Sequence, residues 1–514
     1  MPLDLPRRCA VALATLAVAA PAGAQTLTSF TPNNLVISTV QNVAPGLANH
    51  SLDTASPITL SQFALSTDGK TATANGSLVL PQTASGANAA ISGEYGSASE
   101  GTLQLSVDGR YLTIMGYGVN ATTFNTASAA GGGSFGATAL GQTTSLTGGA
   151  NTVVPRVVAL IGSDGSVDTT TALTGVFNTN NPRSVATVDG SSFYVSGQGV
   201  TGDGTGGVFY AAKGATTATA ISAGSSPSNA SSTSASLGTE TRVVEIVNTG
   251  SGLTLQVSRD VKVSGTPNDA TDIRSFTDAS GGLPTSSSGL VATRLLNTNT
   301  STGAGGNTAG GNTSSINLGG TANVTSGLDN NLNSSRNTKF VYLSPEQFFY
   351  ANATTLYIAD SGSPKNGSAG AAQIGEGGLQ KWSFINNVWT LDYVIYNGLS
   401  LVNNNTASTT DPTAAGVTGL FGLTGQVESD GTVELFATSY GLNELSSSYL
   451  YEVTDTLSNT TPVGTNETFT TLYSAPSGTL IRGVSFAPVP EPASLALLGA
   501  GLIGLGALRR RARG

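Results

Sequence analysis

Short runs of alternating or uniformly apolar residues recur along most of the chain, whereas helical periodicity is nearly absent. The runs are rich in Val, Leu, Ile, Thr and aromatic residues, and Gly-, Ser- and Asn-rich segments separate them, which is the pattern of β-strands joined by turns. The clearest runs cover residues 35–40, 58–65, 103–107, 111–115, 153–161, 192–195, 243–247, 253–257, 340–343, 355–359, 379–384, 389–395, 433–438, 449–453 and 481–486. The sequence therefore predicts an all-β protein built from antiparallel sheets.

Asp-Gly pairs stand beside several of these runs. Glycine accepts a positive φ without a Cβ clash, so each pair is a candidate for a two-residue type I′ hairpin turn. The five pairs are Asp68-Gly69, Asp108-Gly109, Asp164-Gly165, Asp189-Gly190 and Asp430-Gly431.

Some of the strand pairs repeat one another. Residues 192–210 and 355–382 each contain a strand, a loop of small residues, a Gly-x-Gly-Gly turn and a second strand. Looser copies bring the number of units to five, centred on Leu112, Phe193, Thr254, Leu356 and Glu434. Such repeats favour a β-propeller with large blades. A sixth blade would be shared by residues 35–40 and 481–486, and seven blades, a β-sandwich or a solenoid are the alternatives.

The composition restricts the kinds of partner that the propeller-like domain can bind. We place this domain, the body of the chain, at residues 25–488. Charged residues make up 10% of the chain. Without the six arginines and two acids of the two terminal segments, 15 basic and 28 acidic residues remain, a net charge near −13. Such a charge argues against nucleic acid or an anionic membrane as a direct partner. Residues 126–149, 216–238 and 297–337 are rich in Gly, Ser, Thr and Asn, and we expect long polar loops or disorder there.

The first residues have the features of an export signal. A basic start and a short apolar run precede Ala22-Gly23-Ala24, and cleavage before Gln25 would remove residues 1–24 after passage through the Sec translocon. Cys9, the one cysteine of the chain, would leave with this segment. The mature protein would then have neither a disulfide nor a thiol nucleophile.

The C-terminal segment, residues 489–514, has three parts in a fixed order. Pro490-Glu491-Pro492 precedes an uncharged run at 493–508, which spans about 24 Å as a short transmembrane helix. Four arginines follow and would stay on the cytoplasmic side as a stop-transfer signal. They are Arg509, Arg510, Arg511 and Arg513. The alternatives are an ordinary C-terminal anchor and a buried core helix.

This arrangement resembles the PEP-CTERM sorting signal of exported Gram-negative bacterial proteins. The resemblance implies processing at the Pro-Glu-Pro motif by an exosortase, a membrane transpeptidase-like enzyme, after an inner-membrane intermediate. It further implies a final place in the cell envelope, at the surface or outside the cell, together with exported polysaccharide. Residues 30–36, 99–112 and 480–488 also resemble exported bacterial propeller proteins, and that resemblance supplies no catalytic motif.

Candidate catalytic residues are few. His50, the one histidine, would have to serve any Ser-His-Asp mechanism. Residues 132–136 match G-x-S-x-G but lack the flanking strand and helix of a nucleophile elbow. Residues 68–71 end like a phosphate loop but read better as a turn. With one histidine and no mature cysteine, a zinc site is not expected.

Calcium is the metal that this composition allows, because it needs only oxygen ligands. Asp203, Asp360 and Glu376 lie on the loops of the repeated units and are weak candidate ligands, with solvated loop acids as the favoured interpretation. Residues 340–396 contain eleven of the aromatic residues, and these include both tryptophans. We expect these aromatic side chains to pack between blades, and a sugar-stacking platform is the alternative.

The sequence thus predicts an exported, surface-directed propeller that acts as a binding or structural component, without a catalytic site or required cofactor. The rival hypothesis is a calcium-dependent propeller hydrolase, such as a phosphatase, phytase or lactonase. A third is a passive spacer without a ligand.

Overall fold

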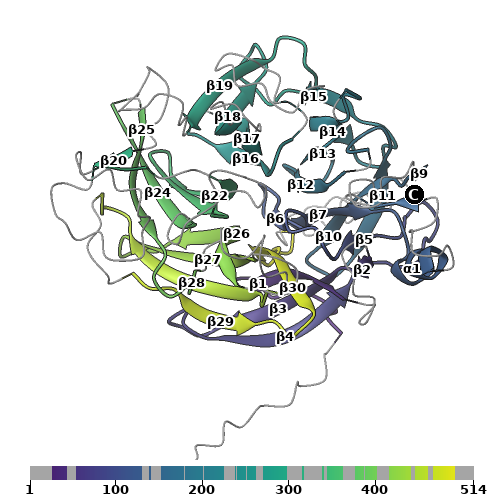
Figure 1. Ribbon diagram of the computed structural model, residues 1–514, viewed down its shortest axis with the longest axis horizontal. Helices are drawn as coiled ribbons and strands as arrows, with labels where there is room; N and C mark the ends of the chain where they lie inside the picture. Colours follow the sequence, from purple (N-terminus) through teal and green to yellow (C-terminus); the bar gives the residue numbers. More distant parts are fainter. Residues whose placement is uncertain are drawn as a thin grey trace, which may run out of the picture.

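The structure is a computed structural model, and it describes residues 26–42, 54–129, 138–140, 152–178, 180–200, 202–224, 238, 240–250, 252–261, 270–297, 315–317, 338–340, 344–362, 377–386, 388–401, 416–441, 446–460 and 467–491. Within these residues, six antiparallel sheets of four or more strands surround a common axis, as Figure 1 shows. Each sheet is one blade of a β-propeller. The all-β, six-bladed fold expected from the sequence is confirmed.

The first three blades, from the innermost strand outward, use the following strands. Blade 1 contains β30 (Thr479–Phe486), β1 (Leu35–Gln41), β3 (Thr59–Leu65) and β4 (Ala72–Val79). Blade 2 contains β6 (Gln104–Leu105), β7 (Tyr111–Tyr117), β10 (Arg156–Gly162) and β11 (Val167–Leu173), with β5 (Ser92–Glu94) and β2 (Ala55–Pro57) added beside β7. Blade 3 contains β12 (Pro182–Ala186), β13 (Ser192–Gly197), β14 (Gly206–Ala212) and β15 (Thr219–Gly224).

The other three blades follow the same order. Blade 4 contains β16 (Val244–Asn248), β17 (Leu253–Val261), β18 (Ala270–Thr277) and β19 (Val291–Asn297). Blade 5 contains β22 (Pro345–Asn352), β23 (Thr355–Asp360), β24 (Gly378–Ile385) and β25 (Val388–Ile395). Blade 6 contains β26 (Val417–Val427), β27 (Thr432–Gly441), β28 (Tyr449–Thr456) and β29 (Thr470–Ser474). Outside the blades lie α1 (Ala121–Ala129), β8 (Thr138–Ala139), β9 (Thr152–Val153), β20 (Ser315–Asn317) and β21 (Thr338–Phe340).

Blade 1 closes the ring with strands from both ends of the body. β30 pairs antiparallel with β1, and the register places Leu35 opposite Phe486 and Val40 opposite Leu480. The closing blade expected from the sequence is confirmed. The five repeated units are confirmed as well, because each centre lies on the second strand of a different blade. These strands are β7 for Leu112, β13 for Phe193, β17 for Thr254, β23 for Leu356 and β27 for Glu434.

The core is divided among the blade interfaces. Among the described residues, buried apolar side chains form six clusters that each join two neighbouring blades. Both tryptophans belong to the cluster between blades 4 and 5: Trp382 is fully buried and Trp389 is 6% exposed. Phe348 of blade 5 and Ile273 of blade 4 belong to the same cluster. The packing interpretation of the aromatic residues therefore holds for the two tryptophans.

The five Asp-Gly pairs do form hairpin turns, but the predicted type I′ geometry is wrong. In the first, Gly69 has φ +68° and its N–H donates to the carbonyl of Ser66, whereas Asp68 does not have a positive φ. This is a type I turn followed by a left-handed glycine. The Asp68 carboxylate accepts hydrogen bonds from the Lys70 N–H and the Ser66 hydroxyl. These bonds stabilise the charged form and lower the pKa of Asp68.

The two faces of the ring differ in their connections. Because neighbouring strands are antiparallel, inner-to-second and third-to-outer connections share one face, which we call the short-turn face. All five Asp-Gly turns lie there. Second-to-third and outer-to-inner connections share the opposite face, the loop face. The connections between β7 and β10, β15 and β16, and β19 and β22 start and end on the loop face, and they contain most of the three polar stretches.

Parts of these stretches are regular, contrary to expectation. Residues 126–129 complete α1, and β15 supplies the outer strand of blade 3 from a segment of Ala, Thr, Ser and Gly. Ile221 is the side chain of β15 that reaches the core between blades 3 and 4. The rest of the three stretches lies almost entirely outside the described residues.

Candidate binding face and axial cavity

A small cavity lies on the propeller axis, and its volume is about 150 Å³. All six inner strands, or the residues just after them, contribute to its wall, which identifies it as the central channel. Representative lining residues are Gln104, Thr187, Glu245, Phe348, Thr424 and Ser485. Sites for drug-sized ligands commonly measure about 300–1,000 Å³. The channel therefore has room for a few waters or a very small molecule.

Polar side chains in this channel connect blades to one another. The Gln104 amide donates to the Ser184 hydroxyl at 3.0 Å and to the Val244 carbonyl at 2.8 Å, which joins blades 2, 3 and 4. The Leu423 N–H donates to the Gln347 side-chain oxygen at 3.0 Å, which joins blades 6 and 5. These amides act as structural bridges across the axis.

Glu245 is the titratable side chain that lines the channel within the described residues. Burial raises the pKa of Glu245 to about 8, and a hydrogen bond from the Phe348 N–H opposes this rise. The carboxyl group is therefore largely protonated at neutral pH. In that form it can donate a hydrogen bond to a small guest in the channel.

Charged side chains gather where the inner strands begin, at the loop-face end of the axis. Arg183 donates to the Ser99 hydroxyl at 3.1 Å and pairs with Glu240 at 3.1 Å. Arg242 lies 3.3 Å from Glu240 and 3.5 Å from Glu346. We call Arg183, Glu240, Arg242 and Glu346 the charge ladder; together with Ser99 it joins blades 2 to 5. Burial lowers the pKa of Arg183, and nearby Arg242 adds to the effect. The arrangement fixes the inner strands on the side of the ring where the loops are long.

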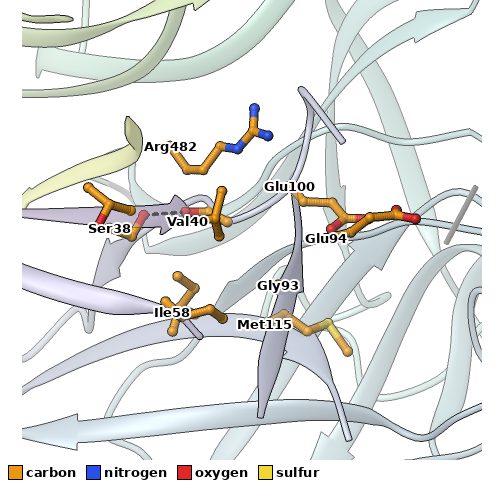
Figure 2. A pocket seen from close by; sticks show the side chains of 11 residues that line it. Ser38, Val40, Ile58, Gly93, Glu94, Glu100, Met115 and Arg482 are labelled. Carbon is orange, nitrogen blue, oxygen red and sulfur yellow. Dashed lines mark hydrogen bonds between the residues drawn. The ribbon is translucent and has the colours of Figure 1, made fainter. Parts of the chain in front are cut away.

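Another buried polar group lies between blades 1 and 2. Figure 2 shows the Glu94 and Glu100 carboxyl groups close to each other at a cavity of about 10 Å³, which Arg482 also lines. Tyr117 donates to Glu100, and the Arg156 guanidinium lies 4.8 Å from the centre of the Tyr117 ring. Burial raises the pKa of Glu100 to about 7. The cavity has room for about one water molecule, so this cluster is a structural network of the interface.

A third polar cluster joins blades 5 and 6. The ammonium group of Lys381, which is fully buried, lies 2.9 Å from Asp455. Tyr357 and Tyr393 donate to the same carboxylate at 2.5 and 2.7 Å. Burial alone would raise the pKa of Asp455, but hydrogen bonds with Glu467, Tyr357 and Lys381 outweigh it, and the pKa is lowered. Burial, together with the hydrogen bond to Asp455, raises the pKa of Glu467 to about 8.

The candidate calcium ligands do not form one site. Asp203, in blade 3, is exposed and accepts hydrogen bonds from the N–H and hydroxyl of Thr205. Asp360, in blade 5, is buried and accepts from the N–H of Gly362 at 2.9 Å. Glu376 lies outside the described residues. In the part of the chain that the structure describes, no three His, Cys, Asp or Glu side chains are grouped to hold a metal ion. Calcium binding stays a prediction.

Most other candidate residues lie outside the described part of the chain. These are His50, the G-x-S-x-G match at 132–136, the leader with Ala22, Ala24 and Gln25, and the tail from Pro492 through Arg509, Arg510, Arg511 and Arg513. Residues 68–71 form the turn between β3 and β4, as expected. Among the described residues, no helix has the length and hydropathy to cross a membrane. The expected helix at 493–508 lies outside them.

The buried arginines were missed at the sequence level, although a signal for them exists. Among the described residues, six arginines are buried. Arg183, Arg242 and Arg482 each stand two residues before a valine on or beside an inner strand, Arg156 and Arg259 do so on β10 and β17, and Arg274 lacks this spacing. In a body with few basic residues, this repeated Arg-x-Val spacing marks structural arginines.

Comparison with known families identifies the C-terminal segment. The family model described as the PEP-CTERM protein-sorting motif matches residues 488–511. No curated protein matches the sequence. The chain therefore carries a PEP-CTERM sorting motif. The motif indicates an exported protein that is anchored transiently in the membrane and then processed by an exosortase-type enzyme.

Proposed function

We propose that this propeller is a binding or structural component of the envelope or extracellular polysaccharide matrix of a Gram-negative cell, without catalytic activity. The observation that supports the proposal most directly is where the sorting motif leaves the ring. β30 is an inner strand that ends on the short-turn face, and the chain stays on that face as far as Glu491. In the membrane-held precursor, the short-turn face is then the one nearer the bilayer.

The loop face consequently points away from the membrane. The long polar connections start and end on this face, and the buried charge ladder of Arg183, Glu240, Arg242 and Glu346 lies at this end of the axis. On this proposal ligands arrive from this side, whereas the hollow of about 560 Å³ between the β3–β4 and β26–β27 turns lies on the short-turn face. A polymer would contact the loop face rather than enter the axis, because the channel of about 150 Å³ is smaller than a typical ligand site.

The rival function, a calcium-dependent hydrolase, requires carboxylates that converge on one ion. Asp203 and Asp360 lie in separate blades, and this separation favours the binding hypothesis. Turnover of p-nitrophenyl phosphate and of a lactone, each with and without calcium, distinguishes the two. Robust calcium-dependent rates would contradict the proposal.

Cell fractionation with intact-mass measurement tests the export part of the proposal. We expect a mature protein that lacks residues 1–24, is processed near Pro490, and is found in the envelope or outside the cell. A full-length chain in the cytosol would contradict this. A glycan array with the mature protein tests the ligand: binding to extracellular polysaccharide supports a binding role, whereas no binding at all favours a spacer.

A further inference from the structure

The sorting motif contacts the body of the propeller. After β30, the Val489 N–H donates to the carbonyl of Gly109 at 2.8 Å, and Arg110 pairs with Glu491 at 2.8 Å. Gly109 and Arg110 belong to the Asp-Gly turn between β6 and β7 on the short-turn face. The glutamate of the Pro-Glu-Pro motif is therefore bound to blade 2.

The turn presents Arg110 in a fixed orientation. Asp108 accepts hydrogen bonds from the Arg110 Nε at 2.6 Å and from its backbone N–H at 3.1 Å. The guanidinium also lies 5.4 Å from the centre of the Tyr111 ring. The turn thus holds the Nε edge of the guanidinium, and Nη1 donates to Glu491. A side chain restrained in this way loses little rotamer freedom on binding.

The motif is also close to the strand that closes the ring. Pro490 is the fourth residue after Phe486, so an extended connection carries it no farther than about 14 Å from the end of β30. An enzyme in the membrane must therefore either approach the short-turn face closely or draw the motif away from it. While the motif is docked, the Val489 N–H and the Glu491 carboxylate already have partners on the propeller.

We propose that the β6–β7 turn is an intramolecular docking site for the sorting motif, and that its opening controls access of the exosortase-type enzyme. The segment that docks there is residues 489–491 of the same chain. The inference rests on the processing that the sorting motif implies. The experiment on the docking site measures maturation of the precursor rather than ligand binding. A negative result is therefore distinguishable from a failure of the proposed binding role.

Precursor maturation in the native host tests the docking site. The full-length chain with Arg110→Ala lacks the ion pair, and Arg110→Glu adds repulsion against Glu491. An exposed pair of this kind changes an equilibrium up to about fivefold, so we expect Arg110→Ala to speed conversion to the processed form about two- to fivefold and Arg110→Glu to speed it further. Lys213→Ala is the matched control: it breaks the 2.9 Å surface pair with Asp168, away from the motif, and should leave the rate unchanged.

Hydrogen exchange of the uncleaved precursor gives an independent readout. We expect faster exchange at the Val489 N–H in Arg110→Ala than in the parent chain, with unchanged protection in β30. Maturation of Arg110→Ala at the parent rate or slower would overturn the proposal, whether or not exchange at Val489 increases. Unchanged exchange would likewise show that Arg110 does not hold the motif.

Discussion

Asp455 is the centre of the polar cluster between blades 5 and 6, and we expect its replacement by Asn to destabilise the propeller strongly. Lys381, Tyr357 and Tyr393, all from blade 5, converge on this one carboxylate of blade 6. The substitution preserves the size of the side chain but removes its charge. Lys381, with no exposed side-chain surface, then loses the carboxylate 2.9 Å from its ammonium group, and Glu467 and Asp392 remain as the acidic groups whose pKa values its charge lowers.

The magnitude follows from the cost of breaking a buried ion pair. Removing one partner of a buried ion pair typically costs about 3–5 kcal/mol. The remaining contacts of Lys381, with the Tyr393 hydroxyl at 3.0 Å and the Thr456 carbonyl at 2.7 Å, place the expected loss toward the lower end, about 3 kcal/mol. Denaturant unfolding of the mature protein, followed by circular dichroism, measures this loss.

A second substitution in the same protein tests the reasoning. In Lys381→Met/Asp455→Asn both charges are absent, while the amide oxygen introduced at position 455 can still accept hydrogen bonds from Tyr357 and Tyr393, so no charge is left buried without its partner. We therefore expect the double variant to be more stable than Asp455→Asn alone. A loss below about 1 kcal/mol for Asp455→Asn, or a double variant less stable than the single one, would refute the assigned role of Asp455.

Two further predictions follow from the same structure. The folded-state pKa values of Glu245 and Glu467 are both about 8, above the unfolded value near 4.3. The stabilisation from each carboxyl group is therefore complete at low pH and is lost as the pH rises through 8. We expect the thermal unfolding midpoint to decrease from about pH 5 to about pH 8.5, and to decrease less steeply in Glu467→Gln. Gly207→Ala should cost about 1–3 kcal/mol more than Gly86→Ala: both glycines have positive φ, but a Cβ at Gly207 would lie 2.1 Å from the backbone carbonyl oxygen of Ser222, whereas the space at Gly86 is open. Equal thermal unfolding midpoints for the two alanine variants would contradict the steric argument. A thermal midpoint that does not change with pH would contradict the raised pKa values.

The fold was largely predictable because its signals are local and repeated. The strand centred on Phe193 and the one centred on Leu356 share a pattern of apolar residues and glycines, and each became the second strand of a blade. Ring closure by residues 35–40 and 481–486 followed from the geometry of a propeller, which needs its ends joined. β15 was missed because its Ala, Ser and Thr residues resemble loop composition, although Ile221 is buried.

The polar interior could not be predicted, because its residues come from distant parts of the chain. Lys381 and Asp455 are far apart in sequence, and only the packing of blade 5 on blade 6 brings them together. The contact of Arg110 with Glu491 likewise depends on where β30 ends. The turn type was wrong for a local reason: the carboxylate of Asp68 caps the turn, and this favours a type I turn followed by glycine.

Labelling of single cysteines in the membrane-held precursor shows which face of the ring is accessible, and we propose that the loop face points outward while the short-turn face lies toward the membrane. The body offers a cysteine-free background. Val200→Cys places an exposed thiol between β13 and β14 on the loop face, and Ser429→Cys places one on the β26–β27 turn of the short-turn face. With a membrane-impermeant maleimide on spheroplasts that retain the precursor, we expect the thiol at position 200 to be labelled faster than the thiol at position 429. Equal rates, or faster labelling at 429, would contradict it.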